Sequence, residues 1–235
     1  MRYLMAAIPF FLLACQVTPE NSTTIPAIVS VPLEIDGNSK DWDQIPKKFE
    51  TRNFESPWDD TPFGSTHFQA VADNNWLYFC FEAEDTTLVT KPFTKELDVA
   101  DGDRVEIFIS ADTSLAPYYC LELGPTGDIL DYKAHFYRKF DDSWNLPQLS
   151  VRTSMKSQGY TVEGKIPLGF LKKFSNHHVN QPTLSLYLGL YRAEYRKSPN
   201  NEVIEQWLTW NDPQISEPDF HIPSTLKQVK IEIAK

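Results

Sequence analysis

A strand-like segment around Glu106 carries charged side chains in a pattern suited to ligand binding. Apolar Val105, Ile107 and Ile109 alternate with Arg104 and Glu106, and this period of two is typical of a β-strand with one buried face. Successive strand side chains point to opposite faces, so Glu106 is expected opposite the Val and Ile residues. Glutamate is depleted in strands. Two interpretations follow, a solvated face with an Arg104–Glu106 charge pair or a face that binds a ligand.

Familiar catalytic signatures are absent from the sequence. It has no GxSxG nucleophile elbow, no glycine-rich phosphate loop, no HExxH and no CxxC. The five histidines show no zinc-ligand spacing. The 32 Asp and Glu residues are numerous enough to include a glycosidase pair, but their spacing does not single one out. The sequence therefore favours binding without catalysis.

The charge balance argues against polyanionic partners. The chain has 32 acidic against 22 Lys and Arg residues, a net charge of -10. Such a surface opposes the phosphates of nucleic acids, and no basic cluster with interleaved aromatic residues offsets it. No apolar run reaches the length of about 18 residues that a membrane-spanning helix needs.

The N-terminus predicts export and a lipid anchor. Residues 1–14 read as a signal peptide, with Arg2 before an apolar run that ends in Leu-Leu-Ala before Cys15. This end resembles a bacterial lipobox, in which the cysteine is acylated; the alternative is an ordinary secretory signal. Residues 15–30, rich in Thr, Ser, Pro and Glu, are expected to be a flexible tether. We therefore expect a membrane-anchored lipoprotein in the periplasm or on the cell surface.

Residues 31–235 are predicted to form one all-β domain, an immunoglobulin-like antiparallel sandwich of about ten strands with one short helical turn at 168–174. Short β-rich segments separated by turn signals support this fold class. Trp42 is expected to fill the core beneath the turn at 36–41. The predicted strands lie at residues 31–35, 66–72, 76–83, 103–110, 118–123, 128–136, 149–155, 160–166, 183–195, 202–210 and 226–233.

Two further cysteines, Cys80 and Cys120, lie in predicted strands. In an oxidising compartment they could form a disulfide, which requires adjacent strands in matching register. They could also be two separate buried thiols that act as small hydrophobic residues. The sequence leaves both interpretations open.

Five pieces of sequence, in this order, resemble the family-9 carbohydrate-binding modules, which belong to the wider DOMON-like class. The resemblance covers nearly all of residues 31–235. Its pieces are Ile-Asp-Gly at 35–37 followed by Trp42, Trp-Leu-Tyr at 76–78 leading to Glu-Asp at 84–85, Asp-Arg-Val-Glu-Ile-Phe at 103–108, Trp-Asn-Asp-Pro at 210–213, and Phe-His-Ile-Pro at 220–223.

The resemblance implies a sandwich that holds the end of a sugar chain between two tryptophans. Phe220 takes the position of one clamp tryptophan, Glu106 matches the carboxylate that accepts hydrogen bonds from sugar hydroxyls, and Ala100 stands where the second tryptophan is expected. A pyranose ring offers an apolar face to aromatic rings and hydroxyls to carboxylates and guanidinium groups. The candidates to replace the missing ring or to bind hydroxyls are Trp144, Trp207, Trp210, Tyr191 and Arg192, of which Arg192 and Trp210 are placed in the predicted site.

The resemblance also implies structural calcium, with Asp36 and Asp85 at the family's calcium-bearing loops; the alternative for both is turn capping. The predicted function is therefore non-catalytic binding of an oligo- or polysaccharide in support of carbohydrate catabolism. One rival is a glycosidase or a domain associated with hydrolysis of O-glycosyl compounds. The other is a haem-binding redox module of the DOMON type, with Met155 and one of His67, His135 or His221 as ligands.

Overall fold

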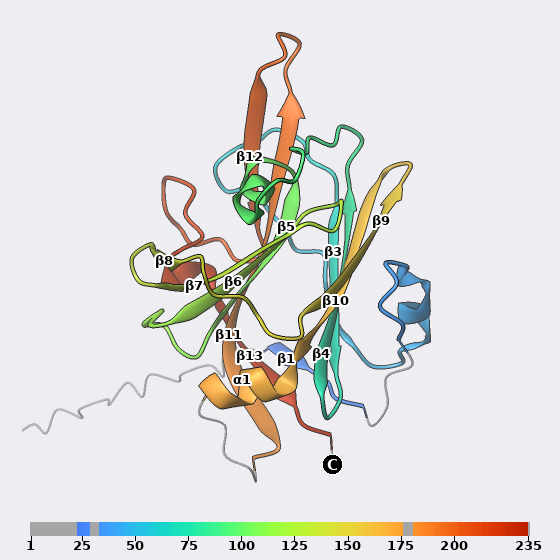
Figure 1. Cartoon of the computed structure of the whole chain (residues 1–235), viewed down its shortest axis with the longest axis vertical. Coiled ribbons are helices and arrows are strands. Elements are labelled where there is room, and N and C mark those ends of the chain that lie inside the picture. The colour runs from blue at the N-terminus through green and yellow to red at the C-terminus, as the bar shows by residue number, and fades with distance from the viewer. Residues whose placement is uncertain (1–22, 29–32, 176–180, 235) are drawn as a thin grey trace, which may run out of the picture.

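The computed structural model describes residues 23–28, 33–175 and 181–234. The predicted signal peptide and Cys15 lie outside this part of the chain. The described residues form two sheets packed face to face (Figure 1), and most of the strands are antiparallel. The predicted all-β sandwich is confirmed.

The larger sheet has eight strands and carries the candidate site. Strand β11 (Thr183–Lys197) is its centre, because it pairs with β5 (Arg104–Ser110), with β13 (Lys227–Glu232) and, through its second half, with β12 (Val203–Thr209). The sheet continues from β5 through β6 (Tyr118–Leu123), β7 (Ile129–His135) and β8 (Lys139–Asp141), and β1 (Thr23–Ile25) pairs in parallel with β13.

The smaller sheet has five antiparallel strands. Its order is β2 (Phe49–Thr51), β3 (Thr66–Ala72), β4 (Trp76–Glu84), β10 (Gly159–Pro167) and β9 (Ser150–Lys156). The helical turn expected at 168–174 is confirmed as α1 (Leu168–Phe174), which lies across one end of the sandwich (Figure 1). Three short 3₁₀ helices complete the fold: η1 (Ser39–Gln44), η2 (Glu96–Asp101) and η3 (Pro223–Thr225).

The main core lies between the sheets and follows from the alternation along each strand. On β11, Leu184, Leu186, Leu188 and Leu190 are all buried in this core. They face Val105, Ile107 and Ile109 on β5 and the phenylalanine residues on the inner face of β4. The outer face of each sheet carries a smaller apolar cluster of its own.

Trp42 fills the smaller of these outer clusters, beneath η1 as predicted. Its indole Nε1 donates a 2.7 Å hydrogen bond to Glu163 on β10. The other oxygen of Glu163 accepts hydrogen bonds from the backbone N–H groups of Asp36 and Gly37. Gly37 has φ +87° and lies against the backbone of Thr153, where a Cβ would come within 2.7 Å. The turn is therefore fixed onto the outer face of the smaller sheet.

Three predictions about the chain need correction. The stretch predicted as tether contains β1, so the sheet begins at Thr23 rather than near residue 31. The predicted strand at 31–35 is irregular over its described part, residues 33–35. Strands β2 and β8 were not predicted, because segments of three residues show no measurable periodicity.

The disulfide that the sequence left open between Cys80 and Cys120 is not formed. Cys80 and Cys120 are both free and buried. Cys80 lies on β4 of the smaller sheet and Cys120 on β6 of the larger one, each in the outer cluster of its own sheet. Both thiols therefore act as small apolar side chains, and burial raises the pKa of each well above its ordinary value.

Candidate functional site

A cavity of about 390 Å³ opens on the outer face of the larger sheet. Its floor and sides come from strands β5, β6, β7, β8 and β12. Residues of η2 and of the segment at 218–221 also line it. Its lining combines aromatic, aliphatic and charged side chains. These are Leu97, Ala100, Arg104, Glu106, Glu122, Leu130, Tyr132, Arg138, Phe140, Asp142, Trp207, Pro218, Asp219, Phe220 and His221.

The floor is a buried group of three charged side chains. Glu106 on β5 stands directly opposite Glu122 on β6 in the strand register, so both carboxylates lie on the same face of the sheet. Nε of Arg104 lies 2.9 Å from Oε1 of Glu106 and 2.7 Å from Oε2 of Glu122. Nη1 of Arg104 donates hydrogen bonds to the carbonyls of Ala100 and Gly102. One guanidinium thus serves two carboxylates.

This shared arrangement leaves the floor one negative charge in excess when both carboxyls are ionised. Glu106 is only 2% exposed, and burial, with a further contribution from the charge of Glu122, raises the pKa of Glu106 to about 8. Tyr132 on β7 donates a 2.8 Å hydrogen bond to Oε1 of Glu122. No described residue donates a hydrogen bond to Oε2 of Glu106. That oxygen is the acceptor which the floor presents to a ligand.

Aromatic rings form the inner wall of the cavity. Phe220 stacks on Tyr191, with ring centroids 4.0 Å apart and planes 11° from parallel. Trp207 on β12 meets Phe220 edge-on at 5.7 Å, and the guanidinium of Arg104 lies 5.5 Å from the centroid of the Trp207 ring. These contacts fix the rings beside the charged floor, where they can pack on the apolar face of a ligand.

The outer wall is built from the β7–β8 hairpin, which is held to the segment at 218–221. Asp219 accepts hydrogen bonds from Tyr137 and Arg138, both at 2.7 Å. Phe140 on β8 is 51% exposed and lies 5.3 Å from the ring of His221. His221 shares a 2.8 Å hydrogen bond with the hydroxyl of Tyr118, and burial, with the charge of Arg138, lowers the pKa of His221 to about 4. The imidazole is therefore neutral at physiological pH.

The structure brings together two of the four predicted carbohydrate contacts. Glu106 and Phe220 both line the cavity, and Ala100 lines it as well. Phe220 is only 6% exposed, because Tyr191 stacks on one face of its ring and Trp58 and Trp207 also pack against it. The predicted Arg104–Glu106 charge pair forms within the cavity, but both side chains are buried, so the interpretation of a solvated face is wrong.

The other two predicted contacts, Arg192 and Trp210, lie away from the cavity. Arg192 is fully buried on the inner side of β11, where its guanidinium donates to the carbonyls of Gly64 and Glu84 and pairs with Glu194. Trp210 is 4% exposed and packs in the main core against Phe49. Neither side chain lines the cavity, so the expectation that they contact a sugar there needs correction.

Sequence reasoning did not single out Glu122, Tyr132 and Phe140. The signal for Glu122 was present, because it alternates with Leu121 and Leu123 as Glu106 alternates with Val105 and Ile107. Trp207 was among the candidates and lines the cavity. Phe140 gave no signal, since β8 is too short for its pairing to be read from the sequence.

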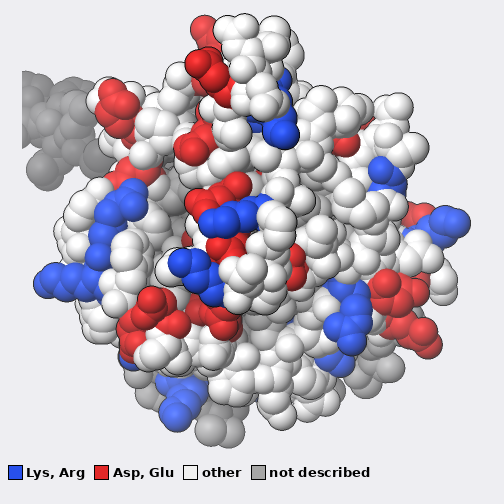
Figure 2. Space-filling model, turned by 45° about the horizontal axis from the view of Figure 1, so that its top comes forward, with Lys and Arg blue, Asp and Glu red and all other residues white. Residues whose placement is uncertain are grey.

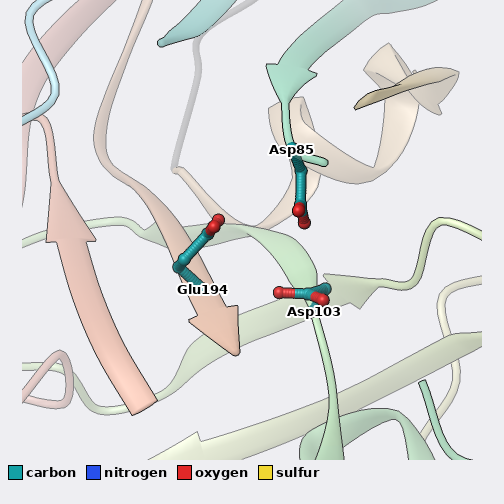
Figure 3. A group of neighbouring side chains, drawn as sticks. All are labelled: Asp85, Asp103 and Glu194. Atoms are coloured by element: carbon teal, nitrogen blue, oxygen red, sulfur yellow. The ribbon is translucent and has the colours of Figure 1, made fainter. Parts of the chain in front are cut away.

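A second group of acidic side chains lies inside the sandwich. Asp85 at the end of β4, Asp103 before β5 and Glu194 on β11 point toward one another (Figure 3), each with an oxygen within 4.8 Å of the others. Burial raises the pKa of Asp103 and of Glu194 to about 7 each. Arg192 contacts Glu194 and lies 3.8 Å from Oδ2 of Asp85, whereas Asp103 accepts hydrogen bonds from the backbone N–H groups of Val89 and Tyr195.

These residues fit a calcium ion better than the pair expected from the sequence. Oδ1 of Asp85 accepts a 2.7 Å hydrogen bond from the backbone N–H of Thr87, which is turn capping. Its Oδ2 is buried with no hydrogen-bond partner among the described residues, and carboxylate oxygens are the ligands that Ca²⁺ prefers. Asp36 does not belong to this group. It is exposed, and its Oδ1 accepts from the backbone N–H of Asn38, which is turn capping.

The ligands expected for a haem do not converge. Met155 is on β9 at the edge of the smaller sheet, whereas His135 is on β7 of the larger sheet and His221 lines the cavity on the outer face of that sheet. His67 shares the smaller sheet with Met155, but β10 and β4 separate their strands, which places the strands about 14 Å apart at the usual spacing.

The surface agrees with the charge balance of the sequence. On the face shown in Figure 2, acidic and basic side chains are interspersed, and the basic ones form no continuous patch. Within the described residues, no helix has the length and apolar character needed to cross a membrane.

The two-sheet sandwich and its cavity define a β-sandwich binding module. The outer face of the larger sheet carries aromatic rings beside charged groups that can form hydrogen bonds. The chain belongs to the carbohydrate family 9 binding domain-like family, which it matches over residues 35–232. This family was the one expected from the five sequence pieces. A search of curated proteins found no match.

Solved structures show the same fold. A protein from Bacteroides uniformis ATCC 8492 proposed to bind carbohydrate has a TM-score of 0.70 and 14% identity, with 90% of this chain and 99% of that chain covered. A family-9 module from Caldicellulosiruptor kristjanssonii, solved with glucose and with cellotriose, has a TM-score of 0.56 and 18% identity. The match covers 91% of this chain and 97% and 95% of those two chains.

Proposed function

We propose that the protein binds the end of a neutral or weakly charged glycan in the cavity of the larger sheet, without catalysing a reaction. The aromatic wall packs on the apolar face of a pyranose ring, and the floor exchanges hydrogen bonds with its hydroxyls. The observation that carries the proposal is Glu106, a buried carboxylate with one oxygen open to a cavity walled by Trp207 and Phe220. The family match and the glucose and cellotriose complexes of a structural neighbour support the choice of ligand class.

Titration calorimetry with a panel that includes glucose and cellotriose tests this proposal. Replacing Glu106 by alanine should weaken binding by roughly 1.5–3 kcal/mol, because it removes a charged hydrogen-bond acceptor, while thermal stability changes little since Glu122 keeps its contact with Arg104. Asp43→Asn is the matched control, as it removes one exposed carboxylate on η1, beside the opposite sheet. The proposal fails if no glycan binds, if Glu106→Ala binds like the parent, or if the parent steadily releases reducing sugar.

We also propose a structural calcium ion held by Asp85, Asp103 and Glu194. Three carboxylates are buried close together, and Arg192 pairs with only two of them, Asp85 and Glu194, so the group needs a further positive charge. At a calcium concentration of a hundred times Kd, the unfolding temperature should rise by about 5–10 °C relative to chelator. Asp103→Asn should lose most of this rise and Asp43→Asn should retain it. An equal rise in both variants would place the ion elsewhere.

The third part of the proposal concerns location. We infer from the sequence that Cys15 carries lipid and anchors the protein at a membrane, where it supports carbohydrate catabolism by retaining glycans near degrading enzymes. Cys15→Ser should shift the protein from the membrane fraction to the soluble fraction of cells. Unchanged membrane association of the Ser variant would contradict lipidation.

A further inference from the structure

The charges around the cavity are unequal in number. Four carboxyl side chains line it against two guanidinium groups. Arg138 is satisfied by Asp219 at 2.7 Å on the outer wall, and Asp142 is exposed at the rim. On the floor, Arg104 is divided between Glu106 and Glu122. The deepest polar atoms of the site therefore carry one carboxyl more than the guanidinium can neutralise.

Burial makes this excess matter for a ligand. Glu106, Glu122 and Arg104 are each 5% exposed or less, so water screens their charges poorly. A buried carboxylate without full compensation takes up a proton or binds another cation. A ligand that contacts Oε2 of Glu106 therefore lies next to these three poorly screened charges.

We propose, on the basis of the proposed carbohydrate-binding function, that the floor selects glycans by charge: it favours a sugar with a protonated amino group over the matching neutral sugar and rejects a uronate. The ammonium supplies the missing positive charge and up to three hydrogen-bond donors to the floor carboxylates. A sugar carboxylate at the same position adds a negative charge to a floor whose single guanidinium already faces two carboxyl groups. Like charges placed together in a buried site repel each other strongly, so a uronate should bind weakly.

A proton on Glu106 competes with the ligand's ammonium. The titratable or charged groups that face Glu106 are Arg104 on β5, Cys120 and Glu122 on β6, Tyr132 on β7 and Tyr191 and Tyr195 on β11. Burial first, and Glu122 second, raise the pKa of Glu106 to about 8, so most of the population holds a proton there at pH 7. Binding an ammonium should displace it, whereas a neutral sugar should leave it in place. Calorimetry in two buffers with different ionisation enthalpies measures this proton release.

The experiment compares glucose, its 2-amino and 6-amino derivatives and glucuronate, all at pH 7 with the purified protein. An amine with an ordinary pKa of about 8 is largely protonated at this pH. We expect at least one amino derivative to bind about tenfold more tightly than glucose, and glucuronate to bind at least about tenfold more weakly. Glu122→Gln should reduce both differences, because it removes one floor charge and keeps an oxygen for Tyr132. Asp43→Asn should leave them unchanged.

The outcomes separate this inference from the proposed function. If glucose binds and both amino derivatives bind no more tightly than glucose, or if glucuronate binds as well as glucose, selection by charge is wrong and sugar binding stands. If no sugar in the panel binds, both fail. Glu106→Gln provides the same charge change should Glu122→Gln fold poorly. Differences that persist in Glu106→Gln and Glu122→Gln alike would also overturn the assignment to the floor.

Discussion

Replacing Arg104 by methionine should lower the free energy of unfolding by about 3–5 kcal/mol at pH 8, because it leaves two buried carboxylates without their shared cation. Sugar binding should be lost with it, since Arg104 also holds Glu106 in place. The loss of stability should shrink as the pH falls and the carboxyl of Glu106 takes up a proton. Chemical denaturation of parent and variant between pH 4.5 and 8 measures the difference.

The sign of this pH dependence follows from Glu106. Its pKa in the folded protein is raised above the ordinary value of 4.5 to about 8, so the folded state binds more protons than the unfolded state between these values. The contribution of Glu106 to stability is therefore fully present below about pH 4.5 and is lost as the pH rises toward 8. Removing Arg104 raises the pKa further and steepens this loss.

Two variants control the Arg104 experiment. Arg104→Lys keeps a positive charge but cannot reproduce both hydrogen bonds to the carbonyls of Ala100 and Gly102, so it should lie between parent and methionine variant. Adding Glu106→Gln and Glu122→Gln to Arg104→Met removes the uncompensated charge and should recover most of the stability. A methionine variant as stable as the parent at pH 8 would show that the floor is not an interdependent charged group.

Most of the correct predictions came from the alternation of apolar and polar residues along single strands. Val105, Ile107 and Ile109 assigned one face of β5 to the core, and this placed Glu106 on the face that forms the cavity. The same rule would have corrected one of the two misplaced residues, Arg192. Arg192 is an even number of positions from Leu188 and Leu190 on β11, so all three side chains point to the same inner face.

The remainder depends on contacts between strands far apart in the sequence. Glu122 joins Glu106 only because β5 and β6 pair in one particular register, and a shift by one residue would reverse the face of every side chain on one strand. Trp207 and Trp210 are three positions apart, so their side chains point to opposite faces. Trp207 stands opposite Ala193 on the cavity face, whereas Trp210 lies in the core. Without the partner strand, neither face of β12 could be named as the binding face.

The calcium expectation shows the same limit. A single acidic residue in a turn, such as Asp36, has local hydrogen bonds that account for it. The group that fits an ion consists of the residue after β4, the residue before β5 and a residue near the C-terminal end of β11. Asp85 could be identified from the resemblance, but Asp103 and Glu194 join it only through tertiary packing.

Arg192→Met should destabilise the protein by about 3–5 kcal/mol and leave sugar affinity unchanged. The guanidinium of Arg192 is fully buried, donates to the carbonyls of Gly64 and Glu84, and is the cation beside Glu194. Removing it leaves Asp85 and Glu194 without the buried cation that pairs with them. Denaturation, followed by calorimetry on the fraction that folds, measures both effects.

Calcium provides the internal control for this variant. If Asp85, Asp103 and Glu194 hold an ion, Arg192→Met should gain more stability from added calcium than the parent does, because the ion becomes the only positive charge among them. Arg192→Lys should restore part of the stability without calcium, although it cannot span both carbonyls. A variant that keeps its stability but loses sugar affinity would instead support the role first predicted for Arg192, and would require its side chain to reach the opposite face of the sheet.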